Sequence, residues 1–335
     1  MPEKQEITIR DIARRAGVSV STVSRVVNQR VGVKADKRQA VVAAIEAFHF
    51  RPNIIAQGLV RGRSRAVGVL VEEIGAPFFG QFMTGVEEGL KESGLCPVFA
   101  SGPAQARVEH AVELLADMRI AALIVVSGWM PDAEMVTIAQ DVPTVVVGRS
   151  ILGMEERCLL VDNADGAYHG TRHLVELGHR RIALISGRAH LRHAVERRAG
   201  YVRALTEGGL REDPDLIVAA EFDEESGRRA AEELLQRGVP FTAIFAESDR
   251  LAYGASLALY RAGLKVPAEI SLVGFDNLPL SAFMTPPLTT VRQPLVEMGR
   301  MAAQAVISLR AGEAPRLSPL RTELIVREST APPRR

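Results

Sequence analysis

The residues between Thr8 and Asn28 carry side chains suited to reading a nucleic acid. Apolar residues recur at helical spacing from Ile9 to Ala16, Gly17 ends that segment, and a second short helix is expected at residues 20–28. Its outward positions are small and polar apart from one arginine, namely Ser21, Thr22, Ser24, Arg25 and Asn28. Hydroxyls and amides suit phosphate oxygens, and a guanidinium suits O6 and N7 of guanine in the major groove. The spacing is that of a helix-turn-helix, although a small helical bundle with a solvated face has the same periodicity.

Charge separates this segment from the rest of the chain. Residues 1–65 contain 13 Lys/Arg and 5 Asp/Glu, a net charge of +8, whereas the remaining 270 residues have a net charge of −7. Neutralised phosphates supply most of the non-specific affinity for DNA, so a basic end on an acidic body favours a polyanion as its partner.

Motifs of other functional classes are missing from the sequence. There is no Gly-x-Ser-x-Gly elbow and no phosphate-cradling glycine loop, so we expect no catalytic residue, no cofactor and no enzyme activity. His169 and His173 are four residues apart on an expected helix, but no third metal ligand is near, so we expect no metal site. Cys96 and Cys158 are expected to be buried free thiols. No signal peptide and no apolar membrane span is visible, which predicts a cytoplasmic protein.

The elements that position these residues divide into two kinds. Short helices are expected up to about Phe48, followed by a linker up to Arg65. From Ala66 onward, continuous apolar runs such as residues 67–71 and 123–126 alternate with amphipathic helices, which is typical of parallel sheets covered on both faces. There are too many such runs for one sheet, and the pattern restarts near Val161. The sequence therefore predicts an α/β fold with two doubly wound subdomains.

Several segments together resemble the lactose/galactose repressor (LacI/GalR) family. They are residues 8–19 (TIRDIARRAGVS), 22–28 (TVSRVVN), 51–59 (RPNIIAQGL), 178–183 (GHRRIA), 274–277 (GFDN) and 285–294 (TPPLTTVRQP). The resemblance covers essentially the whole chain in order. It implies a helix-turn-helix headpiece at 1–51, a hinge helix and linker at 52–65, and an effector-binding core of periplasmic-binding-protein type at 66–330. The Pro- and Arg-rich residues 331–335 that follow are expected to be a disordered tail. The core would consist of an N-subdomain (about 66–161 and 293–319) and a C-subdomain (about 162–290 and 320–330).

The family resemblance also implies a function and its residues. The protein would be a sequence-specific transcriptional regulator, namely a repressor that binds double-stranded, pseudo-palindromic operator DNA as a homodimer. No membrane partner is implied. The implied DNA contacts are Thr8, Ser19, Val20, Ser21, Thr22, Ser24, Arg25, Asn28, Asn53, Ala56 and Leu59. Val20, Ser21 and Arg25 would read bases. Leu59 would wedge into the minor groove at a central CpG step, although a leucine packed in a linker is the simpler interpretation of that residue alone.

A small effector is expected in the cleft between the subdomains, at the carboxyl ends of the strands. The residues implied are Phe78, Phe79, Arg149, Arg197, Phe222, Asp249 and Asp276. Core packing would also explain the phenylalanines, and an ion pair would explain Arg197 with Asp276. An arginine opposite a carboxylate suits a sugar-like ligand, because each hydroxyl both donates and accepts. Ser248 stands where many relatives carry Asn, so the choice among neutral sugar, sugar acid, sugar phosphate and nucleoside stays open. An enzyme and an extracytoplasmic solute receptor are the rival interpretations.

Overall fold

The structure is a computed structural model that describes residues 7–27, 31–48, 64–102, 105–126, 128, 130–188 and 191–334, with only the backbone of 105–108. The chain divides into two compact units, Met1–Arg65 and Ala66–Arg335, which are described separately. Four of the expected DNA contacts lie outside the described residues, as does the expected hinge helix; they are Asn28, Asn53, Ala56 and Leu59.

In its described residues the first unit contains three helices, α1 (Ile9–Ala16), α2 (Val20–Val27) and α3 (Ala35–Ala47). Ile12, Val23 and Val41 are fully buried at their centre. Thr8 closes the start of α1, because its backbone N–H and its hydroxyl both donate to the Asp11 carboxylate, at 3.0 and 2.6 Å. Gly17 ends α1 with a φ of 64°, a left-handed conformation that lets the chain turn into α2.

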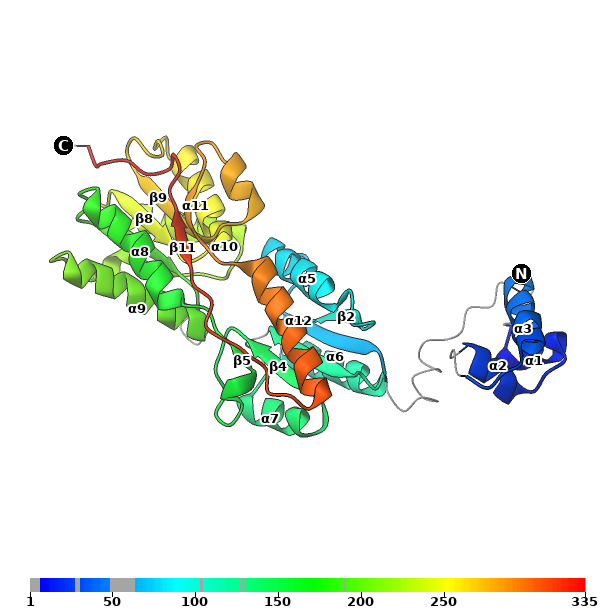
Figure 1. The fold of residues 1–335 in the computed structure, drawn as a ribbon. Helices are drawn as coiled ribbons and strands as arrows, with labels where there is room; N and C mark the ends of the chain where they lie inside the picture. Colours follow the sequence, from blue (N-terminus) through cyan, green and yellow to red (C-terminus); the bar gives the residue numbers. More distant parts are fainter. Residues whose placement is uncertain are drawn as a thin grey trace. The chain divides into compact units, whose positions relative to one another are not determined.

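The second unit contains two sheets (Figure 1). The N-subdomain sheet has the order β2-β1-β3-β4-β5, and its neighbouring strands are parallel. Its strands are β1 (Ala66–Val71), β2 (Cys96–Ser101), β3 (Ala122–Val126), β4 (Thr144–Val147) and β5 (Cys158–Leu159), and its helices are α5 (Pro77–Leu90), α6 (Gln105–Asp117) and α7 (Asp132–Asp141).

The C-subdomain sheet has the order β11-β10-β9-β8-β6-β7, in which only β11 runs antiparallel to its neighbour. Its strands are β6 (Ile182–Ser186), β7 (Ile217–Ala219), β8 (Ala243–Ala246), β9 (Ser271–Asp276), β10 (Thr289–Arg292) and β11 (Glu323–Ile325). Its helices are α8 (Asn163–Glu176), α9 (Arg192–Glu207), α10 (Glu224–Gln236) and α11 (Asp249–Arg261). Both sheets match the expected doubly wound α/β fold.

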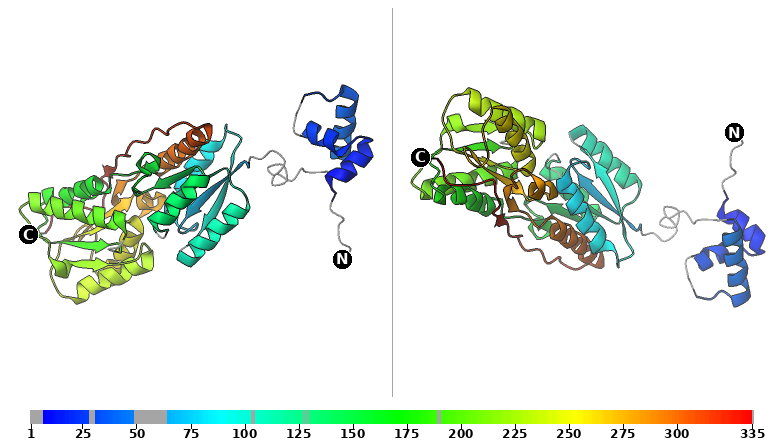
Figure 2. Two further views of the ribbon diagram at one scale, coloured as in Figure 1. Left: turned by 90° about the horizontal axis from the view of Figure 1, so that it is seen from below. Right: turned by 90° about the horizontal axis from the view of Figure 1, so that it is seen from above.

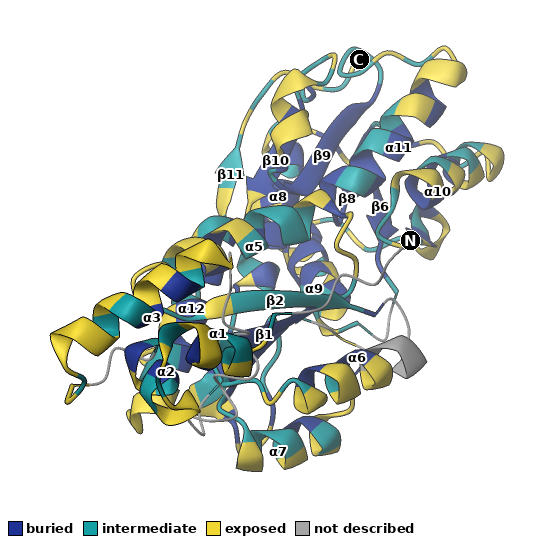
Figure 3. Cartoon of the chain, turned by 90° about the vertical axis from the view of Figure 1, so that its right-hand side faces the viewer, coloured by how far each residue is buried: buried dark blue, intermediate teal, exposed yellow. Residues whose placement is uncertain are grey.

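Apolar clusters lie on both faces of each sheet. In the N-subdomain, Val67 and Val69 pack toward α5, whereas Leu70 and Val125 pack toward the opposite face. In Figure 3 the central strands β8 and β9 are buried, while α6, α7 and α10 expose their outer faces. Burial on both sides explains why these strands read as unbroken apolar runs in the sequence.

The chain crosses between the subdomains three times. It leaves the N-subdomain after β5, returns after β10 to form α12 (Leu295–Ala311), and crosses again to form β11. Figures 1 and 2 show α12 beside α5 of the N-subdomain. The two helices approach closely at glycines: a Cβ on Gly85 would lie 1.9 Å from the carbonyl oxygen of Val296, and one on Gly299 would lie 2.1 Å from that of Phe82.

Two expectations are wrong in the structure. Cys158 is buried but Cys96 is exposed, because it begins β2 at the edge of its sheet. The tail expected to be disordered is held at Ala331, whose N–H donates to the Ser271 hydroxyl at 3.0 Å and whose carbonyl lies 2.9 Å from Nε2 of His179. Burial lowers the pKa of His179, which keeps this imidazole neutral while it joins the tail to the sheet. Among the described residues, no helix is long and apolar enough to cross a membrane.

Candidate functional site

The exposed face of α2 is the candidate nucleic-acid interface. Ser19, Val20, Ser21 and Arg25 are exposed, and Thr22 and Ser24 are partly buried. Ser19 begins the helix: its carbonyl accepts from the Thr22 N–H at 2.9 Å, and its hydroxyl lies 2.8 Å from that of Ser21. Val20 is 42% exposed, as an apolar side chain that meets a thymine methyl group would need to be.

Charge on this helix is suited to an anionic partner. Helix α2 contains no acidic residue in its first turn, and Arg25 in its last turn forms no hydrogen bond or ion pair with any described residue. The free amide groups at a helix N-terminus attract anions, and the guanidinium is available to a base or a phosphate. Thr8, the remaining described residue of the expected set, lies at the start of α1.

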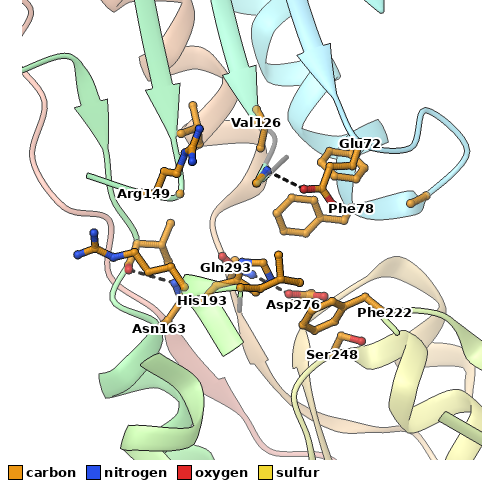
Figure 4. A pocket seen from close by; sticks show the side chains of 18 of the residues that line it. Glu72, Phe78, Val126, Arg149, Asn163, His193, Phe222, Ser248, Asp276 and Gln293 are labelled. Carbon is orange, nitrogen blue, oxygen red and sulfur yellow. Dashed lines mark hydrogen bonds between the residues drawn. The ribbon is translucent and has the colours of Figure 1, made fainter. Parts of the chain in front are cut away.

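A pocket of about 270 Å³ opens between the two subdomains. Figure 4 shows Glu72, Phe78, Val126 and Arg149 on its N-subdomain side, with Phe222, Ser248 and Asp276 opposite them. Six of the seven expected effector residues line it: Phe78, Phe79, Arg149, Arg197, Phe222 and Asp276. They follow the carboxyl ends of β1, β4, β7 and β9 or lie on α9, which is where parallel α/β sheets place ligands.

Asp276 is the polar centre of the pocket. It is 6% exposed, accepts a hydrogen bond of 2.6 Å from Nε2 of Gln293, and lies 3.8 Å from Nη2 of Arg197. Burial raises its pKa to about 6, although Arg197 and Gln293 oppose the shift. Asp276 and Asn277 both have positive φ angles, of 110° and 55°, which L-residues rarely adopt and which frequently mark functional sites.

Arg197 is held rigidly beside Asp276. Its Nε donates to Oδ1 of Asn163 at 3.0 Å, its Nη1 donates to the carbonyl of Glu247, and its guanidinium stacks 3.9 Å from the ring centre of Phe275. Burial lowers its pKa, and Asp276 is the strongest opposing charge. A planar guanidinium fixed on all sides presents a constant surface to a ligand.

Asp249 does not line the pocket. Its carboxylate accepts from the N–H of Leu278 at 2.7 Å and from the hydroxyls of Ser281 and Thr290. Burial and the nearby charge of Asp276 raise its pKa to about 7. The residue therefore ties the start of α11 to the loop after β9, behind the pocket wall.

Other lining residues were not among the expected set. Asn163 and Gln293 are buried at two of the crossings between subdomains, and Ser248 accepts the Leu251 N–H at 3.2 Å to begin α11. The pocket is also lined by five polar or charged side chains and one leucine, namely Glu72, Glu73, Arg192, His193, Arg250 and Leu191. Their position in the sequence could have identified them, because most of these residues come directly after an apolar run or begin the helix that follows it.

The two histidines considered as metal ligands in the sequence lie on α8. His169 pairs with Asp165 at 3.4 Å, whereas His173 lies 2.9 Å from the hydroxyl of Thr330, so the two imidazoles have different partners. Within the described part of the chain, no group of three His, Cys, Asp or Glu side chains is arranged to hold a metal ion.

Comparisons with known proteins assign the chain to a family. Residues 8–53 match the model for bacterial regulatory proteins of the lacI family, and residues 171–330 match a periplasmic-binding-protein-like domain. The HTH-type transcriptional regulator GalR of Escherichia coli (strain K12) is 38% identical over 304 residues, which cover 90% of this chain and 89% of GalR.

Solved structures agree with this assignment. The lac repressor dimer bound to operator and the anti-inducer ONPF matches with a TM-score of 0.85 and 29% identity, covering 98% of this chain and 100% of that one. The complex of the transcriptional regulator CelR with cellobiose matches with a TM-score of 0.73 and 33% identity, covering 96% and 99%. The chain therefore belongs to the LacI family, as a DNA-binding transcriptional regulator with a ligand-binding core and not as an enzyme.

Proposed function

We propose that this protein is a repressor that binds a pseudo-palindromic operator as a homodimer and changes its operator affinity when a sugar-like effector occupies the pocket. The observation that carries the proposal is the pairing of buried Arg197 and Asp276 in a cleft of the same chain that bears the exposed α2 face. A ligand between the subdomains changes their relative position, and such domain movement is a common way to couple two sites.

The pocket supports a sugar-like effector. Phe78 and Phe79 form one apolar side, where their rings lie 5.1 Å apart, and Phe222 contributes an aromatic face from the other subdomain. Aromatic faces pack against the C–H faces of a sugar ring, while Asp276 and Ser248 offer acceptors to hydroxyls. Cellobiose, the ligand bound to CelR, is an example from a relative.

Exposed apolar side chains on the C-subdomain support a homodimer. Leu257 and Tyr260 on α11 are 42% and 79% exposed, and Leu280 and Phe283 in the 3-10 helix Pro279–Phe283 are 53% and 80% exposed. The hydroxyls of Tyr253 and Ser281, 2.7 Å apart, join these two elements. Exposed apolar side chains on two joined elements fit burial against a second copy.

The remaining assignments rest on the family. We propose that residues 1–51 form the headpiece and residues 52–65 the hinge. We also propose that Asn28, Asn53, Ala56 and Leu59 extend the DNA contact, with Leu59 at a central CpG step. Because operator DNA is its partner, the protein acts in the cytoplasm.

Selection of binding sites from random duplex DNA, followed by fluorescence anisotropy on the selected operator, tests this function. Arg25→Ala should weaken operator binding by about 1–3 kcal/mol and relax the base preference at one position, because a bidentate guanine contact is lost. Thr22→Ala is the matched control and should weaken operator and random DNA similarly. Equal losses on both DNAs for Arg25→Ala would contradict its base-reading role, and failure to select any operator would contradict the function.

A further inference from the structure

Four arginines line the effector pocket, and each is already engaged by the protein. Arg149 forms an ion pair of 3.0 Å with Asp132 and donates 2.5 Å to the carbonyl of Met130. Arg192 donates to Glu196 at 2.9 Å. Arg197 faces Asp276 and donates to two further oxygens, as described above.

Arg250 is the most fully occupied of the four. Its Nε and Nη2 donate to both oxygens of Glu224, at 2.9 and 2.8 Å, and its Nη1 donates to Glu73 at 3.1 Å. Its own side chain is 16% exposed, whereas Glu224 and Glu73 are 48% and 55% exposed. Bidentate pairs of arginine with a carboxylate are the strong class of charge-assisted hydrogen bonds, and a ligand group would have to compete with Glu224 for this guanidinium.

Negative charge exceeds positive charge around the pocket. Among the described residues, Glu72, Glu73 and Asp276 line it, and Asp132, Glu196 and Glu224 pair with three of the arginines, so six carboxylates are set against four guanidiniums. Glu247 and Asp249 add two buried carboxyls behind Asp276. Burial raises the pKa of each of these two to about 7; the charge of Asp276 adds to the shift at Asp249, whereas Arg197 opposes the shift at Glu247.

We infer that the effector is an uncharged, hydroxyl-rich molecule, and that the pocket rejects sugar acids and sugar phosphates. This inference rests on the proposed function and narrows its ligand. An anionic ligand would lose its hydration and meet guanidiniums whose charge is already balanced, beside the Asp276 carboxylate. A hydroxyl avoids that repulsion, because it donates to Asp276 and accepts from any remaining N–H.

Matched ligand pairs test the inference on the full chain. Glucose is compared with glucuronate and glucose 6-phosphate, galactose with galacturonate, and cellobiose with cellobiouronate, so that each uncharged sugar has a counterpart that carries a carboxylate or a phosphate. We expect at least one uncharged member to raise the melting temperature and its anionic counterpart to bind at least about tenfold more weakly by calorimetry. An anion that binds as tightly as its uncharged counterpart would overturn the inference.

The outcomes also separate this inference from the proposed function. If an anionic sugar binds and changes operator affinity, the proposed function stands and only the charge argument fails. If no sugar of either kind raises the melting temperature, both the sugar-like effector and its lack of charge are wrong.

A gain of anion binding is a second, independent test. The Nε atom of Arg149 is buried without a hydrogen-bond partner, and Asp132 is its ion-pair partner. Asp132→Asn should release this guanidinium and give the pocket a measurable melting-temperature rise with glucuronate or inorganic phosphate. Glu323→Gln, which releases Arg292 outside the pocket, is the control and should show no rise. If Asp132→Asn responds to anions no more than the unmodified chain, the paired carboxylates are not what excludes them.

Discussion

The two walls of the pocket are built differently. The C-subdomain wall and the adjoining crossings contribute side chains that are both polar and almost completely buried: Asn163, Arg197, Ser248, Asp276 and Gln293. The N-subdomain wall is mainly apolar, with Phe78, Phe79, Val126 and Val147, and its charged residues Glu72, Glu73 and Arg149 are partly exposed.

This difference suggests separate roles: the C-subdomain wall recognises the ligand, and the N-subdomain wall closes over it. Buried polar groups that hydrogen-bond one another keep a fixed arrangement, so the C-subdomain wall can distinguish one pattern of hydroxyls from another. Apolar faces with an exposed charged rim give little directional preference, but they exclude water once they cover the ligand. We therefore expect variants of the two walls to affect specificity and closure unequally.

The largest effect is expected from Asp276→Ala. The change removes the central acceptor of the C-subdomain wall and leaves Gln293 and Arg197 without their shared partner. Each lost or unpaired contact costs about 1–3 kcal/mol, so effector affinity should fall by at least about tenfold and the effector should no longer alter operator binding. Calorimetry measures the affinity, and unchanged circular dichroism verifies folding. Unaltered effector affinity would place recognition elsewhere.

A smaller effect is expected from Phe78→Ala on the opposite wall. It removes apolar contact area and an edge-to-face ring pair with Phe79 without unpairing a polar group. Affinity for all bound sugars should fall by a similar factor, about 1–2 kcal/mol, while the order of preference among them is kept. A changed order of preference would show that this wall also determines specificity.

Closure itself should respond to Glu73→Gln. The pair of Arg250 with Glu73 is an ion pair that joins the two walls across the pocket. Glu73 is 55% exposed, so the pair should contribute at most about 1 kcal/mol and the variant should shift the population toward more open forms a few-fold.

Distances between spin labels measure that shift. Leu114→Cys on α6 and Val195→Cys on α9 place labels at exposed positions of the two subdomains, in a Cys96→Ser background. Glu88→Gln is the control, because it breaks a similar pair with Arg300 inside the N-subdomain. A longer or broader distance distribution is expected for Glu73→Gln alone, and identical distributions would disprove its role in closure.

The smallest effect concerns the dependence of stability on pH. Burial raises the pKa of Glu247 from 4.5 to about 7 and that of Asp249 from 3.8 to about 7. The folded protein holds these protons more tightly than the unfolded chain does. The contribution of the two carboxyls to stability is therefore complete below their pKa values in the unfolded chain and is lost as pH rises through 7. The melting temperature should therefore increase from pH 8 to pH 6. Glu247→Gln should flatten this slope, whereas Glu113→Gln at an exposed position should not.

The sequence predicted the sheets better than the pocket network. Runs such as residues 67–71 are apolar because both faces of the sheet are covered. Their pattern therefore predicted buried parallel strands. The contacts of Arg197 with Asn163, Glu247 and Asp276 join residues far apart in the chain, and no local periodicity encodes them. The family resemblance predicted that Arg197 and Asp276 line the pocket. It did not predict the ion pairs that Asp132, Glu196 and Glu224 form with the other pocket arginines.

Two local expectations were wrong for identifiable physical reasons. Cys96 follows an apolar leucine, but its strand lies at a sheet edge, and edge position depends on the strand order and not on composition. The proline- and arginine-rich end resembles a disordered tail, yet backbone groups of Ala331 bond with Ser271 and His179. Backbone hydrogen bonds of this kind do not require a particular side chain at Ala331, so composition could not reveal them.

The crossing of the chain between subdomains has a consequence for biosynthesis. The three helices of the DNA-reading unit are contiguous and leave the ribosome first, so this unit can fold during translation. The N-subdomain cannot complete its core at that stage, since Leu295, Met298 and Ala302 of α12 belong to the same apolar cluster as Val67 and Phe82. Until α12 emerges, α5 covers that face of the sheet without its partner helix. A ribosome that stops before residue 295 would thus release a chain whose headpiece is formed but whose effector-binding core is unfinished.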